Sequence, residues 1–418
     1  MFNRDQPGSP EWHGDGESHL YGTHPFMMCK TPNNNFIGML FYNSNAQQVT
    51  VRFSSSGKTV INYKTVGGIF DIYYFMSDSA DAIIRKYNNL VGKPALPPFW
   101  ALGFHQSSWG YDSIDDLKTV KEKYKENNYM LDTIWTDIEY MQDYIDFTID
   151  NDRFEGLKEF VNDLHDDHLH YVPILDAGIS IKKPEEGENW YEKGNKENVF
   201  IKSTKNSNNT FDGNLIAQVW PGYTAFVDFL HPKSTEYWHD GLDALYEQVN
   251  FDGIWLDMNE PSNFWVDDDK SIGECYPKND TIKRRTLESD SPVKPGVFDD
   301  LPFTPGNDKL ETKTLSMDAY FYDLGQKNND KNNTFVMYNI HNMYGTLETK
   351  ATNEYFTKDN KRPLIISRDS FVGHGKYGSI WTGDNDAKMK DLKLSMNQIM
   401  HFNMFGIPFV GADICGFS

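Results

Sequence analysis

Two hydrophobic patterns occupy the first hundred residues. Between residues 36 and 76, apolar and polar side chains alternate, with small polar or glycine turns at 54–57 and 67–68. A period of two is typical of antiparallel strands with one buried face, so this region predicts part of a β-sandwich. A helical stripe follows at 83–90, and then a proline-rich linker at 94–98. We therefore expect a domain boundary near residue 93.

Beyond the linker, short apolar runs alternate with amphipathic stretches. One stretch begins with Ser113 as N-cap and places Ile114, Leu117, Val120 and Tyr124 on one helical face. Similar stripes cover residues 154–164 and 238–249. Alternation of buried strands with helices predicts a parallel barrel or a doubly wound sheet. The strand candidates are 100–106, 133–138, 171–178, 253–258, 335–340, 363–368 and 408–414.

We expect the α/β class, with a (β/α)8 TIM barrel at 93–418 preceded by part of a β-sandwich domain at 1–92. Such barrels contain eight strands in about 250 residues, and we expect the eighth strand to lie beyond Ser418. Two connections, near 180–225 and 265–315, exceed ordinary loop length and are expected to form lobes over the barrel mouth.

The most informative segment is residues 253–264, which read GIWLDMNEPSNF. The apolar run predicts a buried strand, and Pro261 cannot continue it because it lacks an amide hydrogen. Asp257 and Glu260 therefore stand at the carboxyl end of that strand. Paired carboxylates beside apolar side chains are costly to desolvate unless they have partners or perform chemistry. For an arbitrary pair of acids at this spacing, a capped strand end is the favoured interpretation.

The whole segment resembles glycoside hydrolase family 31, the α-glucosidases, and this resemblance reverses that preference. In the family the aspartate matching Asp257 is the nucleophile and the glutamate matching Glu260 supports it. Asn263 matches the lysosomal and digestive branch, whereas the glucosidase II branch usually has valine there. The resemblance implies a retaining α-glucosidase that acts on terminal α-1,4-linked glucose of maltose-like or glycogen-like substrates.

A second segment, residues 366–384, follows another strand candidate. Its glycines at 373–378 fit the GxGxxG pattern of dinucleotide binding, but no apolar helix follows, which weakens that interpretation. We expect instead that this loop folds Trp381 and Asp384 over a pocket, with Arg368 at the strand end. The family resemblance implies Asp384 as acid/base, Arg368 on sugar hydroxyls and Trp381 as a stacking residue.

Hydrolysis with retention needs two carboxyl groups on opposite sides of one glycosidic bond. We therefore expect the carboxyls of Asp257 and Asp384 to lie about 5 to 7 Å apart, near the range for retaining enzymes. Asp369 departs from the family, in which many members have serine or threonine.

The remaining pocket candidates stand at other strand ends, where barrel enzymes assemble their sites. The resemblance gives Asp137 the role of binding sugar hydroxyls. Core packing is as plausible as sugar contact for Ile174, Trp220 and Phe417, because apolar side chains usually pack inside. The full set of expected substrate-binding residues is Asp137, Trp109, Ile174, Asp176, Trp220, Trp255, Met258, Arg368, Trp381, Asp413 and Phe417.

The composition of the chain disfavours some classes of binding partner. The formal net charge of -21 and pI of about 4.9 disfavour nucleic acid and anionic lipid surfaces. No run is long enough to span a bilayer. The acidic run at 267–269 favours a solvated loop over a cation site. We expect a carbohydrate substrate and no metal or organic cofactor.

Cys29, Cys275 and Cys415 are far apart and define no disulfide framework or metal site. In the family, cysteines near the positions of Cys275 and Cys415 pair with downstream partners. Three N-glycosylation triplets begin at Asn208, Asn279 and Asn332. No apolar leader follows Met1, so a lysosomal or secreted location is implied by the resemblance alone.

Two alternatives stay open. One is an α-xylosidase or glucosidase II type of hydrolase on the same barrel. The other is a noncatalytic, sugar-binding chain in which the unclosed barrel does not order its site.

Overall fold

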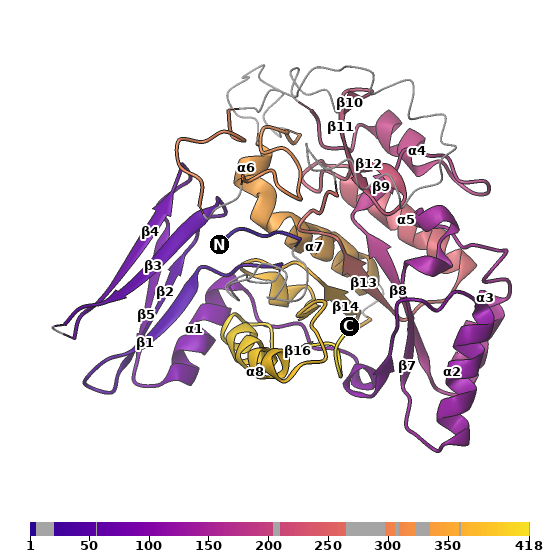
Figure 1. Ribbon diagram of the computed structural model, residues 1–418, viewed down its shortest axis with the longest axis horizontal. Helices are drawn as coiled ribbons and strands as arrows, with labels where there is room; N and C mark the ends of the chain where they lie inside the picture. Colours follow the sequence, from indigo (N-terminus) through magenta and orange to yellow (C-terminus); the bar gives the residue numbers. More distant parts are fainter. Residues whose placement is uncertain are drawn as a thin grey trace.

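A seven-stranded parallel sheet forms the centre of the protein in the computed structural model (Figure 1). The structure describes residues 1–5, 21–55, 57–203, 210–264, 297–305, 309–322, 335–358 and 361–417. Cys275, the asparagines of the three glycosylation triplets, the acidic run at 267–269 and much of the 265–315 insertion lie outside these residues.

The strands of this sheet follow one another in space as they do in the chain. Their order is β6-β7-β8-β13-β14-β15-β16, and every neighbouring pair is parallel. A doubly wound sheet reverses its order at a switch point, whereas a barrel does not. The barrel prediction is therefore confirmed. The strands are β6 (His105–Gln106), β7 (Thr133–Thr136), β8 (His170–Asp176), β13 (Gly253–Asp257), β14 (Leu364–Ser367), β15 (Ser379–Trp381) and β16 (Val410–Gly411).

Three predictions about the barrel need correction. Of the strand candidate at 100–106, only His105–Gln106 forms a strand, and Phe99–Leu102 forms a 3-10 helix. The apolar run at 335–340 forms a helix, α6 (Met337–Ile340), after a single bridge at Val336, because a short apolar run fits a buried helix as well as a strand. The segment predicted as a loop over the pocket contains β15, which pairs with β14 in parallel. Its preceding glycines lead into a strand, and a dinucleotide fingerprint requires a helix there.

The predicted amphipathic helices are present and cover the sheet. In α2 (Ile114–Glu126) the Asp116 carboxylate accepts a hydrogen bond from the Ser113 amide at 3.0 Å, as in a capping box. Apolar faces of α3 (Leu157–Asp166) and α5 (Ser234–Gln248) are buried. The remaining long helices of the barrel are α7 (Tyr344–Thr357) and α8 (Met389–Met404). Among the described residues, no helix has the length and apolarity needed to cross a membrane.

The insertion at 180–225 adds a four-stranded antiparallel sheet beside the barrel. Its order is β10-β11-β12-β9, and it accompanies the helix α4 (Trp190–Glu197). Since β9 begins two residues after β8 ends, this sheet is attached at the carboxyl edge of the barrel. Its strands are β9 (Gly178–Ser180), β10 (Thr210–Phe211), β11 (Asn214–Val219) and β12 (Gly222–Phe226).

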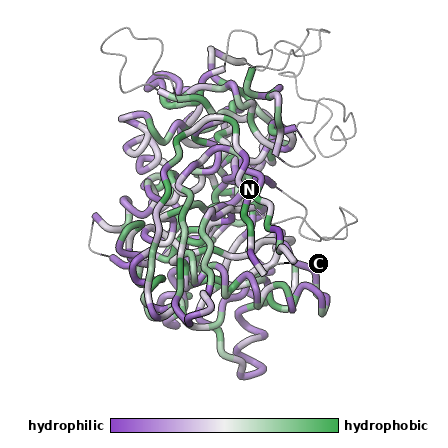
Figure 2. The backbone as a smooth tube through the Cα atoms, turned by 90° about the vertical axis from the view of Figure 1, so that its left-hand side faces the viewer, coloured by the Kyte–Doolittle hydropathy of each residue, from purple (hydrophilic) through white to green (hydrophobic). Residues whose placement is uncertain are grey.

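The N-terminal part consists of antiparallel strands, as predicted. One sheet has the order β1-β2-β5, and β3 and β4 form a separate pair. Figure 2, which views the molecule from the side of these strands, shows hydrophobic and hydrophilic positions interleaved on them. The helix α1 (Ala80–Val91) packs on β5 and buries Ile83 and Tyr87. A boundary near residue 93 stays a prediction. The strands are β1 (Phe26–Lys30), β2 (Phe36–Phe41), β3 (Gln47–Phe53), β4 (Thr59–Thr65) and β5 (Ile72–Ser77).

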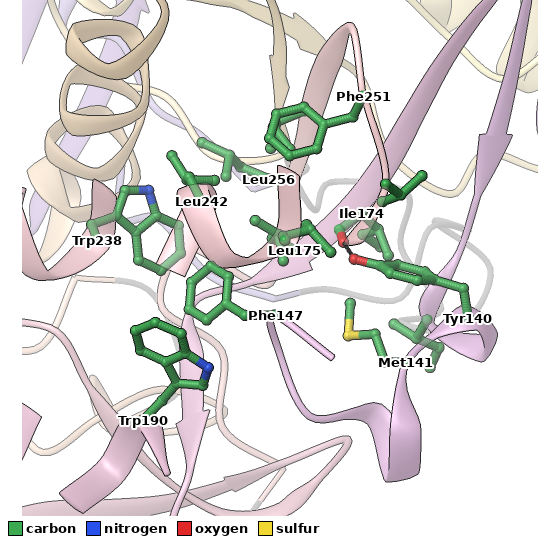
Figure 3. Close-up of a cluster of buried hydrophobic side chains, with 14 of the residues drawn as sticks. Tyr140, Met141, Phe147, Ile174, Leu175, Trp190, Trp238, Leu242, Phe251 and Leu256 are labelled. Carbon is green, nitrogen blue, oxygen red and sulfur yellow. Dashed lines mark hydrogen bonds between the residues drawn. The ribbon is translucent and has the colours of Figure 1, made fainter. Parts of the chain in front are cut away.

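An aromatic cluster joins α5 to the barrel core. Phe147 is 2% exposed and meets the rings of Trp190 and Trp238 edge-on, with centroids 5.2 and 5.3 Å apart (Figure 3). Gly241 lies against the same ring, and a Cβ there would come within 2.6 Å of it. Close packing of this kind leaves little room for the structure to collapse around a missing side chain.

We predict that Phe147→Ala lowers the free energy of unfolding by about 3–5 kcal/mol, because it leaves a cavity among rings that cannot close it. Phe53, which is 81% exposed, gives a matched control, and Phe53→Ala should change stability by less than about 0.5 kcal/mol. Chemical denaturation monitored by tryptophan fluorescence measures both. Equal losses in the two variants would contradict the packing described here.

Candidate active site

The ends of β8, β13 and β14 bring three charged side chains together at one edge of the sheet. Asp176 and Asp257 are register partners at the last positions of β8 and β13. The Arg368 amide donates to the Leu256 carbonyl at 3.0 Å, one residue beyond β14. Parallel strands end at a common edge, so this alignment places the Arg368 side chain beside Asp257.

Arg368 is the centre of a buried ion-pair cluster. Its Nε and one terminal nitrogen donate to the two oxygens of Glu260 at 2.7 and 2.8 Å. Its Nε is also 3.2 Å from Oδ1 of Asp257, and the terminal nitrogen that donates to Glu260 is 3.8 Å from Oδ1 of Asp5. Arg368 is 5% exposed and Glu260 is fully buried. A bidentate guanidinium fixes the geometry of its carboxylate partner, so Arg368 holds Glu260 in place and sets its charge beside Asp257.

Burial and the neighbouring charges set the pKa values of these acids. The pKa of Asp257 is raised to about 6, because the effect of burial, opposed by Arg368 and reinforced by the Asp384 charge, outweighs the rest. Burial raises the pKa of Glu260 to about 7, again opposed by Arg368. Acids whose ionisation is so strongly biased by their surroundings are typical of functional sites.

Asp384 follows β15 and faces the same cluster. Burial raises its pKa, and Arg368 lowers it, while Asp5 and Glu260 raise it. Asp413 lies beyond β16. Its backbone amide donates a hydrogen bond at 3.0 Å to Oδ1 of Asn385, the residue next to Asp384. Burial raises the pKa of Asp413 to about 7, with added effects of Asp384 and Asp257. The Asp384 charge thus raises the pKa of both Asp257 and Asp413.

Asp137 and Asp176 are two further acids at the carboxyl edge of the sheet. Asp137 follows β7, and its Oδ1 accepts from the Ile138 amide at 2.8 Å. Burial raises the pKa of Asp137 well above its usual range, and Asp257 and Asp384 contribute. Asp176 is 1% exposed, and its pKa is raised by burial and by Asp146. The sequence-predicted acids therefore follow neighbouring strands and influence one another's pKa at the carboxyl edge of the sheet.

The predicted aromatic residues form two groups. At the rim, Trp109 stacks on Phe417 with centroids 5.9 Å apart and lies 6.1 Å from Trp220. Within the sheet, Trp255 meets Trp381 edge-on at 5.1 Å. Trp109 and Phe417 are 53% and 43% exposed, which leaves ring surface for a ligand. Stacking against exposed rings suits the apolar faces of sugars.

Ile174 and Met258 are buried in hydrophobic clusters, at 1% and 3% exposure. The Ile174 carbonyl accepts from the Tyr140 hydroxyl at 2.9 Å (Figure 3). Met258 adopts a left-handed backbone with φ of 57°, directly after Asp257. Whether these two side chains also contact sugar stays a prediction, as does the separation of the Asp257 and Asp384 carboxyls.

Sequence reasoning missed two residues from the N-terminal segment. Asp5 accepts from the Ser262 hydroxyl at 2.8 Å and neighbours Arg368. The Tyr21 ring lies over the Arg368 guanidinium, with its centroid 4.5 Å away. No periodic pattern surrounds either residue, and more than 340 positions separate each from Arg368 in the sequence, so no local signal pointed to them.

A second network supports the site from beneath. The Asn259 amide donates to Glu348 at 2.8 Å and to Ser367 at 2.9 Å, and its oxygen accepts from the Asp369 amide at 2.9 Å. All four residues are fully buried. Asn259 thereby links the ends of β13 and β14 to α7. Asp369 takes part through its backbone amide.

Cys29 and Cys415 are free and exposed. Within the described ranges, no three His, Cys, Asp or Glu side chains are arranged to hold a metal ion. The absence of a cofactor stays a prediction.

The fold and site together define an α/β barrel with a cluster of carboxyl groups at the carboxyl edge of its sheet. A family model described as the glycosyl hydrolases family 31 TIM-barrel domain matches residues 94–418. The chain therefore belongs to glycoside hydrolase family 31.

Known relatives agree with this assignment. The chain is 35% identical to intestinal sucrase-isomaltase of Oryctolagus cuniculus over 425 residues, covering 100% of this chain and 21% of that protein. It is 35% identical to lysosomal alpha-glucosidase of Mus musculus over 418 residues, covering 100% of this chain and 39% of that protein. The chain thus spans well under half of the length of these relatives.

Solved structures share the fold. The glucosidase II alpha subunit superposes with a TM-score of 0.77 at 24% identity, over 100% of this chain and 40% of that one. A family 31 alpha-glucosidase from Bacteroides thetaiotaomicron gives a TM-score of 0.67 at 27% identity, over 95% of this chain and 54% of that one.

We predict that Glu348→Gln stabilises the protein more at pH 7.5 than at pH 4.5. Burial raises the pKa of Glu348 well above its usual range, so the folded state keeps the proton that the unfolded state releases above about pH 4.3. The wild-type glutamate therefore loses stability as pH rises, whereas a glutamine does not titrate. Urea denaturation at the two pH values measures the difference.

The exposed Glu122 on α2 provides the control, since Glu122→Gln should shift stability by less than about 0.5 kcal/mol at both pH values. A Glu348→Gln effect of the same size at pH 4.5 and 7.5 would show that Glu348 is ionised in the folded protein.

Proposed function

We propose that this protein is a retaining α-glucosidase that removes terminal, nonreducing α-1,4-linked glucose from maltose-like oligosaccharides or from glycogen or starch. The observation that carries the proposal is the cluster in which Asp257, at the end of β13, and Glu260, three residues later, meet Arg368, with Asp384 facing them from the segment after β15. Similarity to proteins named sucrase-isomaltase and lysosomal alpha-glucosidase supports the substrate class.

The chemistry assigns one role to each aspartate. An oxygen of Asp257 attacks the anomeric carbon while the bond from that carbon to the leaving oxygen breaks, and Asp384 gives its proton to the leaving oxygen. Asp384 then takes a proton from water, which attacks the same carbon and releases Asp257. Two inversions give net retention.

This sequence of steps requires Asp257 to be ionised while Asp384 is protonated. Arg368, at 3.2 Å, favours the ionised form of Asp257. Burial raises the pKa of Asp384 and favours its protonated form; Arg368 opposes this effect, and the nearby acids Asp5 and Glu260 add to it. Glu260 neutralises much of the Arg368 charge and fixes its orientation, which supports a role in positioning.

Binding of the sugar is assigned to groups around the opening. Asp137 and Asp413 offer carboxyl oxygens to sugar hydroxyls, and the exposed rings of Trp109 and Phe417 offer stacking surfaces. A lysosomal or secreted location and N-glycosylation belong to the same proposal, supported by the names of the relatives.

A glucosidase II or α-xylosidase type is the second candidate, since the glucosidase II alpha subunit shares the fold. One contact favours the first candidate. The Asn263 oxygen accepts from the Gln218 amide at 3.0 Å and its amide donates to Thr314, so it anchors the strand that leads to Trp220. A valine could not make these bonds. Measuring kcat/KM for maltose, isomaltose and an α-xyloside separates the two candidates. A preference for the α-xyloside would exclude the first candidate.

A noncatalytic, sugar-binding role is the third possibility. It differs from the first two candidates because it predicts maltose binding without glucose release. Glucose release from maltose, followed by proton NMR, should give the α-anomer first if the proposed mechanism holds. Saturable maltose binding without any glucose release would favour the noncatalytic role.

We predict that Asp257→Asn lowers kcat/KM for maltose by about 10⁴-fold or more, because the amide cannot form the glycosyl ester. Asp115→Asn on α2, where the side chain is 88% exposed, is the control and should leave kcat/KM unchanged. Turnover by Asp257→Asn equal to that of the wild type, with unfolding temperature retained, would remove Asp257 as nucleophile.

A further inference from the structure

We propose that Tyr21 is a positioning residue for the acid/base Asp384, with its ring seating the Gly383–Asp384 turn and its hydroxyl orienting one carboxyl oxygen. This inference rests on the proposed function, because it concerns the proton transfer that Asp384 carries out.

Tyr21 is held firmly although it belongs to the N-terminal segment. It is 2% exposed, and its carbonyl accepts from the Arg4 amide at 3.2 Å. Two residues later, the Thr23 amide donates to the Ser370 carbonyl at 3.1 Å. Gly22 lies so close to Ser370 that a Cβ would come within 2.6 Å of its hydroxyl. The segment is therefore fixed on the chain that follows β14.

The Tyr21 ring contacts both Arg368 and the turn that precedes Asp384. Its centroid is 4.5 Å from the central carbon of the Arg368 guanidinium, which suits a cation–π interaction. Gly383 meets the same ring, since a Cβ there would lie 1.9 Å from a ring carbon, and its φ of 81° also favours glycine. The turn that carries Asp384 thus packs directly against Tyr21, and the ring determines how far that turn can approach Arg368.

The Tyr21 hydroxyl lies 3.5 Å from Oδ2 of Asp384, at the long limit of a hydrogen bond. Burial raises the pKa of Tyr21 well above its usual range, so the hydroxyl stays protonated and donates. A donor on Oδ2 leaves Oδ1 to transfer the proton to the leaving oxygen. The same donor stabilises the carboxylate that forms when the bond to the anomeric carbon breaks. Tyr21 itself gains and loses no proton.

Leaving groups of different acidity test this role. An activated substrate such as 2,4-dinitrophenyl α-glucoside departs without protonation, whereas maltose needs the proton of Asp384. We expect Tyr21→Phe to lower kcat/KM for maltose about tenfold, the worth of one hydrogen bond to a charged group, and to lower it less than about twofold for the activated substrate.

Tyr237→Phe is the matched control. Tyr237 is fully buried on α5, and its hydroxyl donates to the Trp190 carbonyl at 2.9 Å. This variant should leave the ratio of the two kcat/KM values unchanged. Gly383→Ala provides a second test that keeps the Tyr21 hydroxyl, and by displacing the ring it should also lower kcat/KM more for maltose than for the activated substrate.

A loss by the same factor on both substrates in Tyr21→Phe and in Gly383→Ala would overturn the positioning role while leaving the proposed function intact. If the unaltered protein hydrolyses neither substrate, the proposed function fails and this inference fails with it. A larger loss on maltose in both variants supports the positioning role.

Discussion

The ion pairs of Arg368 are the interaction on which the rest of the site depends. A buried guanidinium contacts Glu260 through two hydrogen bonds, lies next to Asp257 and Asp5, and carries the Tyr21 ring on its face. Removing one partner from such a cluster leaves an uncompensated buried charge, which costs several kcal/mol. The cluster joins β13, β14 and the N-terminal segment, so it fixes their relative positions as well as their charges.

This arrangement explains how a cluster of buried acids can exist inside a folded protein. Asp137, Asp176, Asp384 and Asp413 surround the cluster, and burial favours their protonated forms. Arg368 opposes that tendency most directly at Asp257 and Glu260, its nearest partners. The position of Arg368 close to Asp257 favours the ionised form of that aspartate, which the proposed roles of Asp257 as nucleophile and Asp384 as acid require.

Much of this was predictable from local sequence. An apolar run that ends in a polar residue predicts the carboxyl end of a buried strand. Such positions are held by Asp137, Asp176, Asp257 and Arg368. The strand β15 was missed because it has only three residues and follows a glycine-rich stretch. The run at 335–340 was misassigned because apolar composition without periodicity does not separate helix from strand.

The contacts of Asp5 and Tyr21 with Arg368 could not be predicted from the local sequence, for a different reason. Both depend on the N-terminal segment folding back onto the barrel, where Asn3 exchanges hydrogen bonds with Asn342 at 2.8 and 2.9 Å. Contacts of this kind between distant parts of the chain leave no periodic pattern in the sequence. The departure at Asp369 was visible in the sequence, but its consequence was not, since its amide serves the Asn259 network.

The most direct test of the account is to trap the covalent intermediate with 5-fluoro-α-glucosyl fluoride and to map the label by mass spectrometry of peptides. The account predicts one glucosyl ester per chain, on the peptide that contains Asp257. A label on Asp384 or Asp137, or turnover of substrate with no covalent adduct, would contradict the claim that Arg368 holds Asp257 ready as the nucleophile.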